Sequence, residues 1–493
     1  MKLLTRKGFL GALLAALLVS GCTTYRQVAS KYPKSDIEAI YENALPNPQR
    51  NPVVLIHGFA GATLKRQEDG ATVWGAFFTK NSVLPSKEAG LRAFALDIGD
   101  LEPPVDQSKL AVITDDTQAV ELLQKVKADA VVADINVSIY ASLVELMEKG
   151  GYGPCGSEVP KSSDSDKPPC LTFFYDWRQD NVGNAIALGR FLENARRQLE
   201  EERRISGAES PEPVRFDVVA HSMGGLISRY FLRFGARDVL EEKDPPISWD
   251  GADYIDRLVL IATPNFGSMK VLRELILGRH YPVVKFEPAL VTTWVSPYQM
   301  LPREHHQLWL DEQGQPTEAN ILSAEVWERN GWGPFAPGQD RFLEWIFPEE
   351  TTALARRQRM VEFMSAAFDR AARFYRAMDR PALEPCPTEM VLFAADVQPT
   401  VAKAIVVAEA GQIRLVFEGR KGIEVKAPGD GSVTRASAMA DERLAGGSTG
   451  WLTSPIPWDR EVFLTDTHRT FLGNPTFHNN LLHILLETPP AKR

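Results

Sequence analysis

The sequence is informative first for what it lacks, because each absence removes a class of function. It has 55 Lys and Arg against 64 Asp and Glu, a formal net charge of −9, so no basic surplus is available to neutralise a nucleic-acid backbone. It has neither an H-E-x-x-H motif nor a Cys/His cluster with zinc spacing, and no internal repeat. We therefore expect a globular protein with no nucleic-acid partner, no metal centre and no cofactor.

Cysteine is scarce, with four in the chain. Cys155 and Cys170 bracket a short polar stretch, and export to an oxidising compartment favours a disulfide between them. Cys386 is then left outside the disulfide. The alternative is that these three cysteines all keep their thiols, because spacing alone does not fix the pairing.

A long membrane-spanning run is absent, but a shorter apolar segment lies at the N-terminus. Basic residues in the first seven positions precede an apolar stretch over 9–19, which is short for a span and typical of a secretory signal. The segment ends in V-S-G-C, which resembles the bacterial lipobox, where the cysteine becomes the lipid-modified first residue. We therefore expect a signal peptide over 1–21 and a lipid anchor on Cys22. Thr23 after it favours the outer membrane of the cell envelope.

The order of the expected elements predicts the fold class. Six short β-branched or aromatic runs without strict alternation are typical of strands inside a mostly parallel sheet: 51–58, 91–97, 171–177, 214–222, 256–264 and 389–396. Apolar residues spaced by three and four predict helices at 117–127, 137–149, 186–204 and 224–236. This alternation predicts an α/β fold with a doubly wound, mostly parallel sheet.

Composition also predicts the domain boundaries. Residues 22–50 mix charge with proline and suit a tether. From 265 to 385 no clear strand is visible, and this stretch holds five of the ten tryptophans and a long helical segment near 351–379. We expect it to be a helical cap inserted between two parts of the core, residues 51–264 and 386–493.

A serine lies at the junction of a predicted strand and a predicted helix. Residues 220–224 read A-H-S-M-G, which is the G-x-S-x-G nucleophile elbow with Ala220 in place of the first glycine. Small residues relieve crowding in the strained turn that exposes the hydroxyl, and a helix N-terminus favours developing negative charge. Ser222 is therefore the candidate nucleophile; the alternative is an ordinary N-cap serine.

An acyl-transfer serine also needs donors for an oxyanion. One is normally the N–H after the nucleophile, and the other comes from a loop after an earlier strand. The run V-V-L-I-H-G-F-A-G-A-T-L at 53–64 supplies that loop. We expect the N–H groups of Phe59 and Met223 to be the donors, and His57 to fix the loop rather than act as the base.

The base is chosen by chain order, which in this fold runs serine, acid, histidine. Three histidines lie far enough downstream: His468, His478 and His483. His468 closes the apolar run R-E-V-F-L-T-D-T-H, where it can reach the serine, whereas the other two lie on the following predicted helix. We therefore favour His468, and helix packing or solvent contact explains the other two.

The acid must lie between the serine and the base, at the end of a strand. Asp396 ends V-L-F-A-A-D, while Asp430 lies in a turn-rich stretch, A-P-G-D-G-S-V. Asp430 is the preferred acid and Asp396 the runner-up. Asp176 precedes the serine, so it is expected to fix its own loop around Arg178.

Several segments together resemble the lecithin:cholesterol acyltransferase family of α/β-hydrolases. The matching segments are G-F-A-G-A-T-L (58–64), V-W (73–74), Y-D-W-R (175–178), A-H-S-M-G-G (220–225), S-P-Y-Q-M-L-P (296–302), G-D-G-S-V (429–433) and H-R-T-F-L-G-N (468–474). The resemblance implies Ser222 as nucleophile, Asp430 as acid and His468 as base. It also implies a lid near Trp74 and an acyl-binding cleft under the cap.

These features predict acyl transfer from a lipid ester through an acyl-enzyme at a membrane surface. Water as acceptor gives a lipase or phospholipase, and an alcohol gives an O-acyltransferase. The alternative is a lipoprotein that keeps the hydrolase fold only to bind lipid or a protein partner.

Overall fold

The computed structural model describes residues 40, 44–45, 50–77, 82, 88–129, 134–161, 167–207, 212–281, 284–420, 422–441 and 454–488. The predicted signal peptide over 1–21, the lipidation site Cys22 and nearly all of the predicted tether over 22–50 lie outside the described residues. None of the helices in the described ranges has the length and apolarity to span a bilayer.

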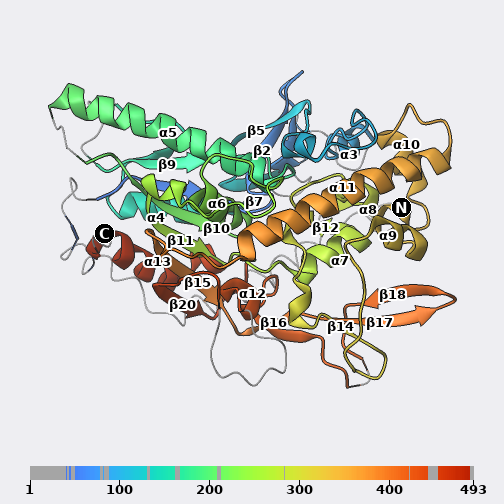
Figure 1. The fold of residues 1–493 in the computed structure, drawn as a ribbon. Coiled ribbons are helices and arrows are strands. Elements are labelled where there is room, and N and C mark those ends of the chain that lie inside the picture. Colours follow the sequence, from blue (N-terminus) through green and yellow to red (C-terminus); the bar gives the residue numbers. More distant parts are fainter. Residues whose placement is uncertain are drawn as a thin grey trace, which may run out of the picture.

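A seven-stranded sheet forms the centre of the molecule (Figure 1). In spatial order its strands are β20 (Arg460–Leu464), β15 (Glu389–Ala395), β11 (Ile255–Ile261), β10 (Phe216–His221), β1 (Val53–Ile56), β9 (Cys170–Phe173) and β8 (Cys155–Gly156). Every neighbouring pair is parallel. All residues of β1, β9 and β15 are buried, which explains their mainly apolar sequences, and the parallel sheet confirms the α/β class.

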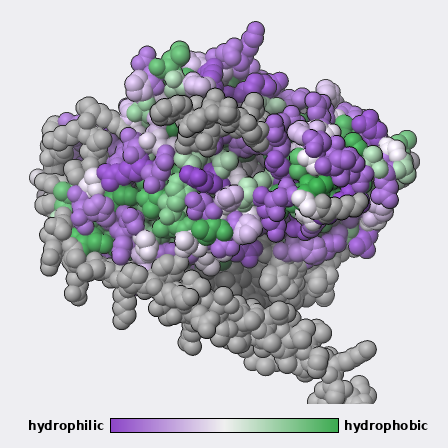
Figure 2. Space-filling view, turned by 90° about the horizontal axis from the view of Figure 1, so that it is seen from below, coloured by the Kyte–Doolittle hydropathy of each residue, from purple (hydrophilic) through white to green (hydrophobic). Residues whose placement is uncertain are grey.

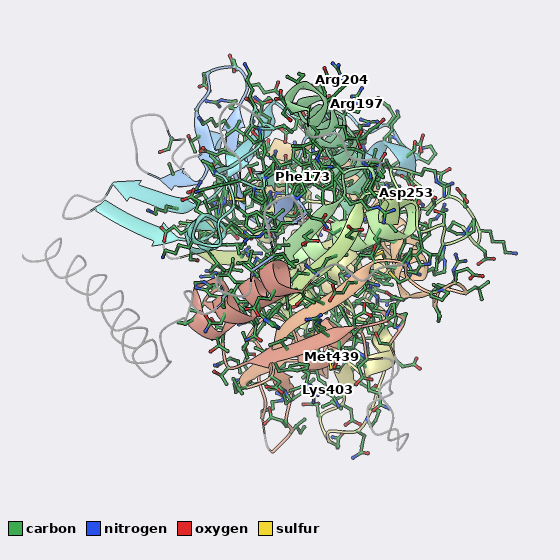
Figure 3. The ribbon with its side chains drawn as sticks, turned by 90° about the vertical axis from the view of Figure 1, so that its left-hand side faces the viewer. Phe173, Arg197, Arg204, Asp253, Lys403 and Met439 are labelled. Atoms are coloured by element: carbon green, nitrogen blue, oxygen red, sulfur yellow. A yellow bond between two sulfur atoms is a disulfide. The ribbon has the colours of Figure 1, made fainter. Side chains whose placement is uncertain are left out.

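Alternate residues of β1 pack into two separate cores. Val54 and Ile56 of β1 join the core that contains α5 (Asn181–Ser206) and α6 (Met223–Phe234), and most buried apolar residues of 265–385 belong to the same core. Val53 and Leu55 point to the opposite face, which is covered by α4 (Ala141–Lys149) and α13 (Pro475–Leu482). The outer face of α5 is polar: Arg197 and Arg204 point away from the sheet in Figure 3, whereas Phe173 lies in the interior. Helices thus cover both faces of the sheet.

The stretch between β11 and β15 is mainly helical. Its helices are α7 (Met269–Leu277), α8 (Pro288–Val291), α9 (Ala324–Asn330), α10 (Asp340–Ile346) and α11 (Ala353–Asp379), which lie to the right of the sheet in Figure 1. The long helix predicted near 351–379 is confirmed by α11. The expectation that this stretch has no strand is wrong, since it contains β12 (Arg279–Tyr281), β13 (Val284–Phe286) and β14 (Trp309–Leu310). Strands of two or three residues are too short to leave a period in the sequence.

Two expected elements in the first half of the chain are also wrong. The predicted helix 117–127 is instead β5 (Thr117–Leu122) followed by β6 (Lys125–Asp129). β5 pairs antiparallel with β2 (Ala62–Arg66), so an available sheet partner overrides the helical spacing. The predicted strand 91–97 starts in α3 (Glu88–Arg92) and continues without regular structure, its apolar residues being buried in a loop.

Smaller sheets complete the fold. β3 (Thr72–Trp74) joins β2 and β5, β4 (Ala76–Phe77) joins β6 and β7 (Asp134–Ser138), β16 (Gln398–Val401) joins β19 (Lys426–Gly429), and β17 (Ala404–Glu409) joins β18 (Gln412–Val416) and β14. The predicted helix 137–149 therefore begins later, at α4, because β7 occupies its first residues. On the face shown in Figure 2, hydrophilic residues prevail among the described residues and hydrophobic ones lie in scattered groups.

Cys155 and Cys170 form a disulfide between β8 and β9. The two residues are directly opposite each other in the parallel register, which brings their Cα atoms to 4.5 Å. Sγ of Cys386 is not in this disulfide and lies 3.5 Å from the carbonyl oxygen of Thr388.

Candidate active site

Ser222 is the single residue between the end of β10 and the start of α6. Its backbone has φ 53° and ψ −122°, a conformation that is strained for a residue with a side chain. The two following glycines make the turn possible. A Cβ on Gly224 would lie 2.4 Å from the carbonyl oxygen of His57, and one on Gly225 would lie 2.1 Å from Oγ1 of Thr263. The helix therefore starts closer to its neighbours than any side chain would permit.

The hydroxyl of Ser222 is the first member of a continuous hydrogen-bond chain. Nε2 of His468 lies 3.0 Å from Oγ of Ser222, and Nδ1 of His468 lies 2.7 Å from Oδ2 of Asp430. The first contact joins two residues separated by 246 positions in the sequence, and the second joins two residues separated by 38 positions. Ser222 and Asp430 are 7% and 3% exposed, so the chain of contacts is largely shielded from water. The arrangement fits a serine hydroxyl, a base that accepts its proton and a carboxylate that orients the base.

The turn after β19 keeps Asp430 ionised. Burial by itself raises the pKa of Asp430, but His468 and the N–H groups of Ser432 and Val433 outweigh burial and bring the pKa below its ordinary value. The two N–H groups donate to Oδ1 at 2.8 and 2.7 Å, which leaves Oδ2 for His468. The backbone N–H of His468 also donates to the carbonyl of Asp430 at 2.9 Å. Asp430 and His468 are thus positioned together.

The alternatives for the acid and base lie elsewhere. Nε2 of His478 bonds to the carbonyl of Leu472 at 2.7 Å, and Nδ1 of His483 lies 3.0 Å from Glu487 on the same helical segment. Asp396 has no hydrogen bond to a histidine among the contacts of the described residues. These three side chains therefore do not join the hydrogen-bond chain at Ser222.

His57 fixes the loop that follows β1. Burial lowers the pKa of His57 to about 4, so its ring is neutral at ordinary pH. Its Nδ1–H donates to the carbonyl of Gly58 at 2.7 Å, and Nε2 accepts the N–H of Tyr175 at 3.2 Å. The ring also stacks on Tyr175 with centroids 4.1 Å apart. Both ring nitrogens are thus engaged in holding the loop.

The two expected oxyanion donors flank Ser222. Met223 is the first residue of α6, and Phe59 follows Gly58, where an added Cβ would lie 2.7 Å from Cβ of Ser222. Within the described part of the chain, the N–H groups of Phe59 and Met223 donate to no protein acceptor. The ring of Phe59 lies 4.6 Å from that of Trp177, which holds its backbone in place. Both N–H groups are therefore available to a charged oxygen beside Ser222.

Residues 114–330 match the family model of lecithin:cholesterol acyltransferase. This match confirms the resemblance drawn from the motifs, and its range contains Ser222 but ends before Asp430 and His468. The sheet order and the strand-serine-helix turn are those of the α/β-hydrolase fold. A chain of the structure titled "The crystal structure of Tle4-Tli4 complex" has 14% sequence identity and a TM-score of 0.49, covering 88% of this chain and 98% of that chain. No curated protein sequence matches the chain.

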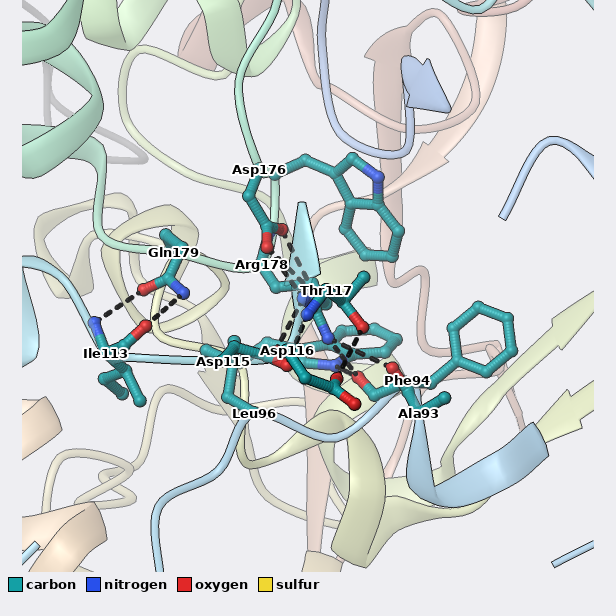
Figure 4. Close-up of polar contacts among 12 residues, drawn as sticks. Ala93, Phe94, Leu96, Ile113, Asp115, Asp116, Thr117, Asp176, Arg178 and Gln179 are labelled. Atoms are coloured by element: carbon teal, nitrogen blue, oxygen red, sulfur yellow. Dashed lines mark hydrogen bonds and ion pairs between the residues drawn. The ribbon is translucent and has the colours of Figure 1, made fainter. Parts of the chain in front are cut away.

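The Y-D-W-R segment shared with the lecithin:cholesterol acyltransferase family holds a loop in place (Figure 4). Arg178 is fully buried, and its guanidinium lies 2.7 Å from both Asp176 and Asp115. The same group donates to the carbonyls of residues 93, 94 and 95 at 3.2, 3.5 and 3.2 Å. Burial raises the pKa of Asp115 to about 6, although Arg178 opposes this shift. Asp176 therefore fixes the loop around Arg178, as its place before the serine indicated.

Trp74, the expected lid residue, is 4% exposed and lies next to the loop after β1. Its Nε1–H donates to the carbonyl of Ala60 at 2.8 Å, and its ring centroid is 5.7 Å from that of Trp177. Trp177 in turn lies 5.3 Å from Trp294 of the cap stretch. An aromatic cluster therefore borders the loop that carries Phe59. The function of Trp74 as a lid stays a prediction.

Tyr140, which was not predicted from the sequence, links this loop to the turn at Ser222. Its hydroxyl accepts the N–H of Gly58 at 2.7 Å and donates to Nδ1 of His221 at 2.8 Å. Burial lowers the pKa of His221 to about 3, so its ring is neutral and Nδ1 can accept this hydrogen bond. In the sequence Tyr140 lies inside the predicted helix 137–149, where a tyrosine by itself indicates packing. Tyr140 is thus a positioning residue for the loop.

Replacing Tyr140 with phenylalanine is expected to lower kcat about tenfold with KM changed less than twofold. The substitution leaves the N–H of Gly58 and Nδ1 of His221 without their hydrogen-bond partner. A tenfold lower kcat corresponds to a loss of about 1.4 kcal/mol. Steady-state kinetics on a soluble ester measure the split. Tyr152→Phe is the matched control, because the buried Tyr152 hydroxyl has no hydrogen-bond partner within the described residues. Equal kcat values for the two variants would refute the positioning function of Tyr140.

Proposed function

We propose that this protein transfers acyl groups from lipid esters through an acyl-enzyme on Ser222. The observation that carries the proposal is the hydrogen-bond chain from Asp430 through His468 to Ser222, at 2.7 and 3.0 Å. The strained turn at Ser222 and the two N–H groups beside it support the same reaction. The match to the lecithin:cholesterol acyltransferase family supports a lipid ester as the acyl donor.

The reaction follows from the positions of these groups. Nε2 of His468 accepts the proton of Ser222 while Oγ attacks the carbonyl carbon of the ester. The carbonyl oxygen becomes an oxyanion, which the N–H groups of Phe59 and Met223 stabilise. The tetrahedral intermediate then breaks its bond to the alcohol oxygen, which leaves with the proton from His468. The acyl group stays on Ser222 until a second acceptor is activated by the same base.

The second acceptor decides the name of the activity. Water gives a lipase or phospholipase, and a long-chain alcohol or sterol gives an O-acyltransferase.

We further propose that a lipid anchor on Cys22 holds the protein at a membrane of the cell envelope, where lipid esters are concentrated. Palmitate is then expected to be incorporated into the exported wild-type protein and not into Cys22→Ser. Equal incorporation into both proteins would refute the anchor.

Product analysis tests the activity directly. The purified protein is incubated with phosphatidylcholine vesicles, with and without a long-chain alcohol, and the lipids are identified by mass spectrometry. Free fatty acid is expected without the alcohol, and a new fatty acyl ester is expected with it if the protein is an acyltransferase. An intact phospholipid pool in both mixtures would contradict the proposed function.

A further inference from the structure

Two arginines lie buried on α6, the helix that begins after Ser222. Arg229 and Arg233 are 2% and 3% exposed and are four residues apart, so they share one face of the helix. The guanidinium of Arg229 donates to Oδ1 of Asn265 at 2.8 Å and to the carbonyl of Met378 at 3.1 Å. Arg233 donates to the carbonyl of Arg380. All of these acceptors are uncharged.

Neither guanidinium has a carboxylate partner in the described part of the chain. Nε of Arg233 is buried and has no hydrogen-bond partner there at all. Burial is the largest influence on both groups and lowers the pKa of Arg229 to about 9 and that of Arg233 to about 10. A buried cation is strongly disfavoured unless an anion lies beside it. The pair therefore needs a negative charge that none of its direct contacts supplies.

The neighbouring charges do not supply it. Asp379, at the end of α11, attracts both arginines, but its two oxygens lie 2.6 and 3.3 Å from the guanidinium of Arg303. Arg380, on the next residue, repels Arg233. The segment 455–457, which borders the same region, contributes no titratable group. Positive charge is thus in excess around the two side chains.

Cys386 lies beside the two arginines. A cavity of about 10 Å³, large enough for one water-sized sphere, is lined by Arg229, Arg233 and Cys386 together with apolar side chains. Cys386 is half-buried, and a negative charge on it would favour the charged form of both arginines. Thiols beside arginine are ionised more readily than ordinary ones.

We propose that Cys386 supplies the missing anion as a thiolate and is thereby a site of covalent modification by thiol–disulfide exchange. The thiolate attacks one sulfur of a small disulfide, RSSR. The Cys386–SR bond forms as the S–S bond of the reagent breaks, and the leaving RS⁻ takes a proton from water. This inference is independent of the chemistry proposed at Ser222.

Alkylation kinetics test the thiolate. The rate of reaction of Cys386 with iodoacetamide is followed by peptide mass spectrometry across pH 5 to 10, on the folded chain and in concentrated urea. The midpoint is expected to be at least about one pH unit lower in the folded protein than in urea, where it should lie near the ordinary ~8.5. In Arg233→Met it is expected to rise by about one pH unit, because one of the two cations is gone. Arg237→Met is the matched control, because Arg237 is half-exposed, and should keep the wild-type midpoint.

Two results would overturn the proposal. One is a folded wild-type midpoint equal to that in urea, which would mean that the counter-ion comes from solution. The other is a low midpoint that stays unchanged in both Arg229→Met and Arg233→Met. If either variant loses its cooperative thermal transition, the comparison of folded and urea-treated wild-type protein still decides. Oxidised glutathione then serves as the disulfide probe, and the expected mixed disulfide maps to the peptide with Cys386.

Discussion

Ser222→Ala is expected to lower kcat for ester cleavage by about 10⁵- to 10⁶-fold, with the protein still folded. No other hydroxyl is within reach of Nε2 of His468 in the described contacts, so the acyl-enzyme cannot form. The lost Oγ makes no hydrogen bond apart from the one to His468, so thermal unfolding should shift little. Kinetics on a soluble ester and labelling by a fluorophosphonate probe measure the effect.

Ser228→Ala is the matched control for this experiment. Ser228 is also a buried serine on α6, and its hydroxyl donates to the carbonyl of Gly224 at 2.8 Å rather than to a catalytic group. This variant should label with the probe and turn over at close to the wild-type rate. Equal labelling of Ser222→Ala and wild type would show that the nucleophile is elsewhere and that the protein is not the enzyme proposed.

The sequence allowed the centre of the fold to be predicted because its signals there are local. The strands at 53–56, 216–221 and 255–261 are almost entirely buried, so each contains a continuous apolar run: V-V-L-I, V-V-A and L-V-L-I. The small residues around Ser222 indicate a strained turn because only they fit it, and the structure shows the contacts that exclude larger ones. Chain order then restricts the acid and the base to a few candidates.

The parts that were predicted wrongly depend on partners distant in the sequence. The run 117–127 has spacing compatible with a helix, but β2 offers it an antiparallel partner, with Ala62 opposite Leu122. The apolar residues at 94 and 96 are buried in a loop held by Arg178, so their burial mimics a strand. Tyr140 was missed because its two partners, Gly58 and His221, become its neighbours only after folding.

Asp430→Asn is expected to lower kcat by about 10³- to 10⁴-fold, the second largest effect after loss of the nucleophile. The amide oxygen can still accept the N–H groups of Ser432 and Val433, so the turn should keep its shape. The amide NH₂ then faces Nδ1 of His468, which favours the tautomer with the proton on Nε2 and leaves no lone pair there to accept the proton of Ser222. Turnover measured on a soluble ester tests this expectation.

The carboxylate itself gives this prediction a second readout. Because the folded pKa of Asp430 lies below its ordinary value, the ionised carboxylate stabilises the folded protein. This stabilisation is fully present above about pH 4 and is lost as pH falls through the folded pKa. The asparagine variant should therefore lose less stability than wild type on acidification, as urea unfolding at several pH values will show. Asp396→Asn is the matched control, since this residue follows β15 and has no contact with His468 among the described residues. Loss of activity in Asp396→Asn, together with full activity in Asp430→Asn, would identify Asp396 after β15 as the acid. It would also refute the hydrogen-bond chain as the basis of the chemistry.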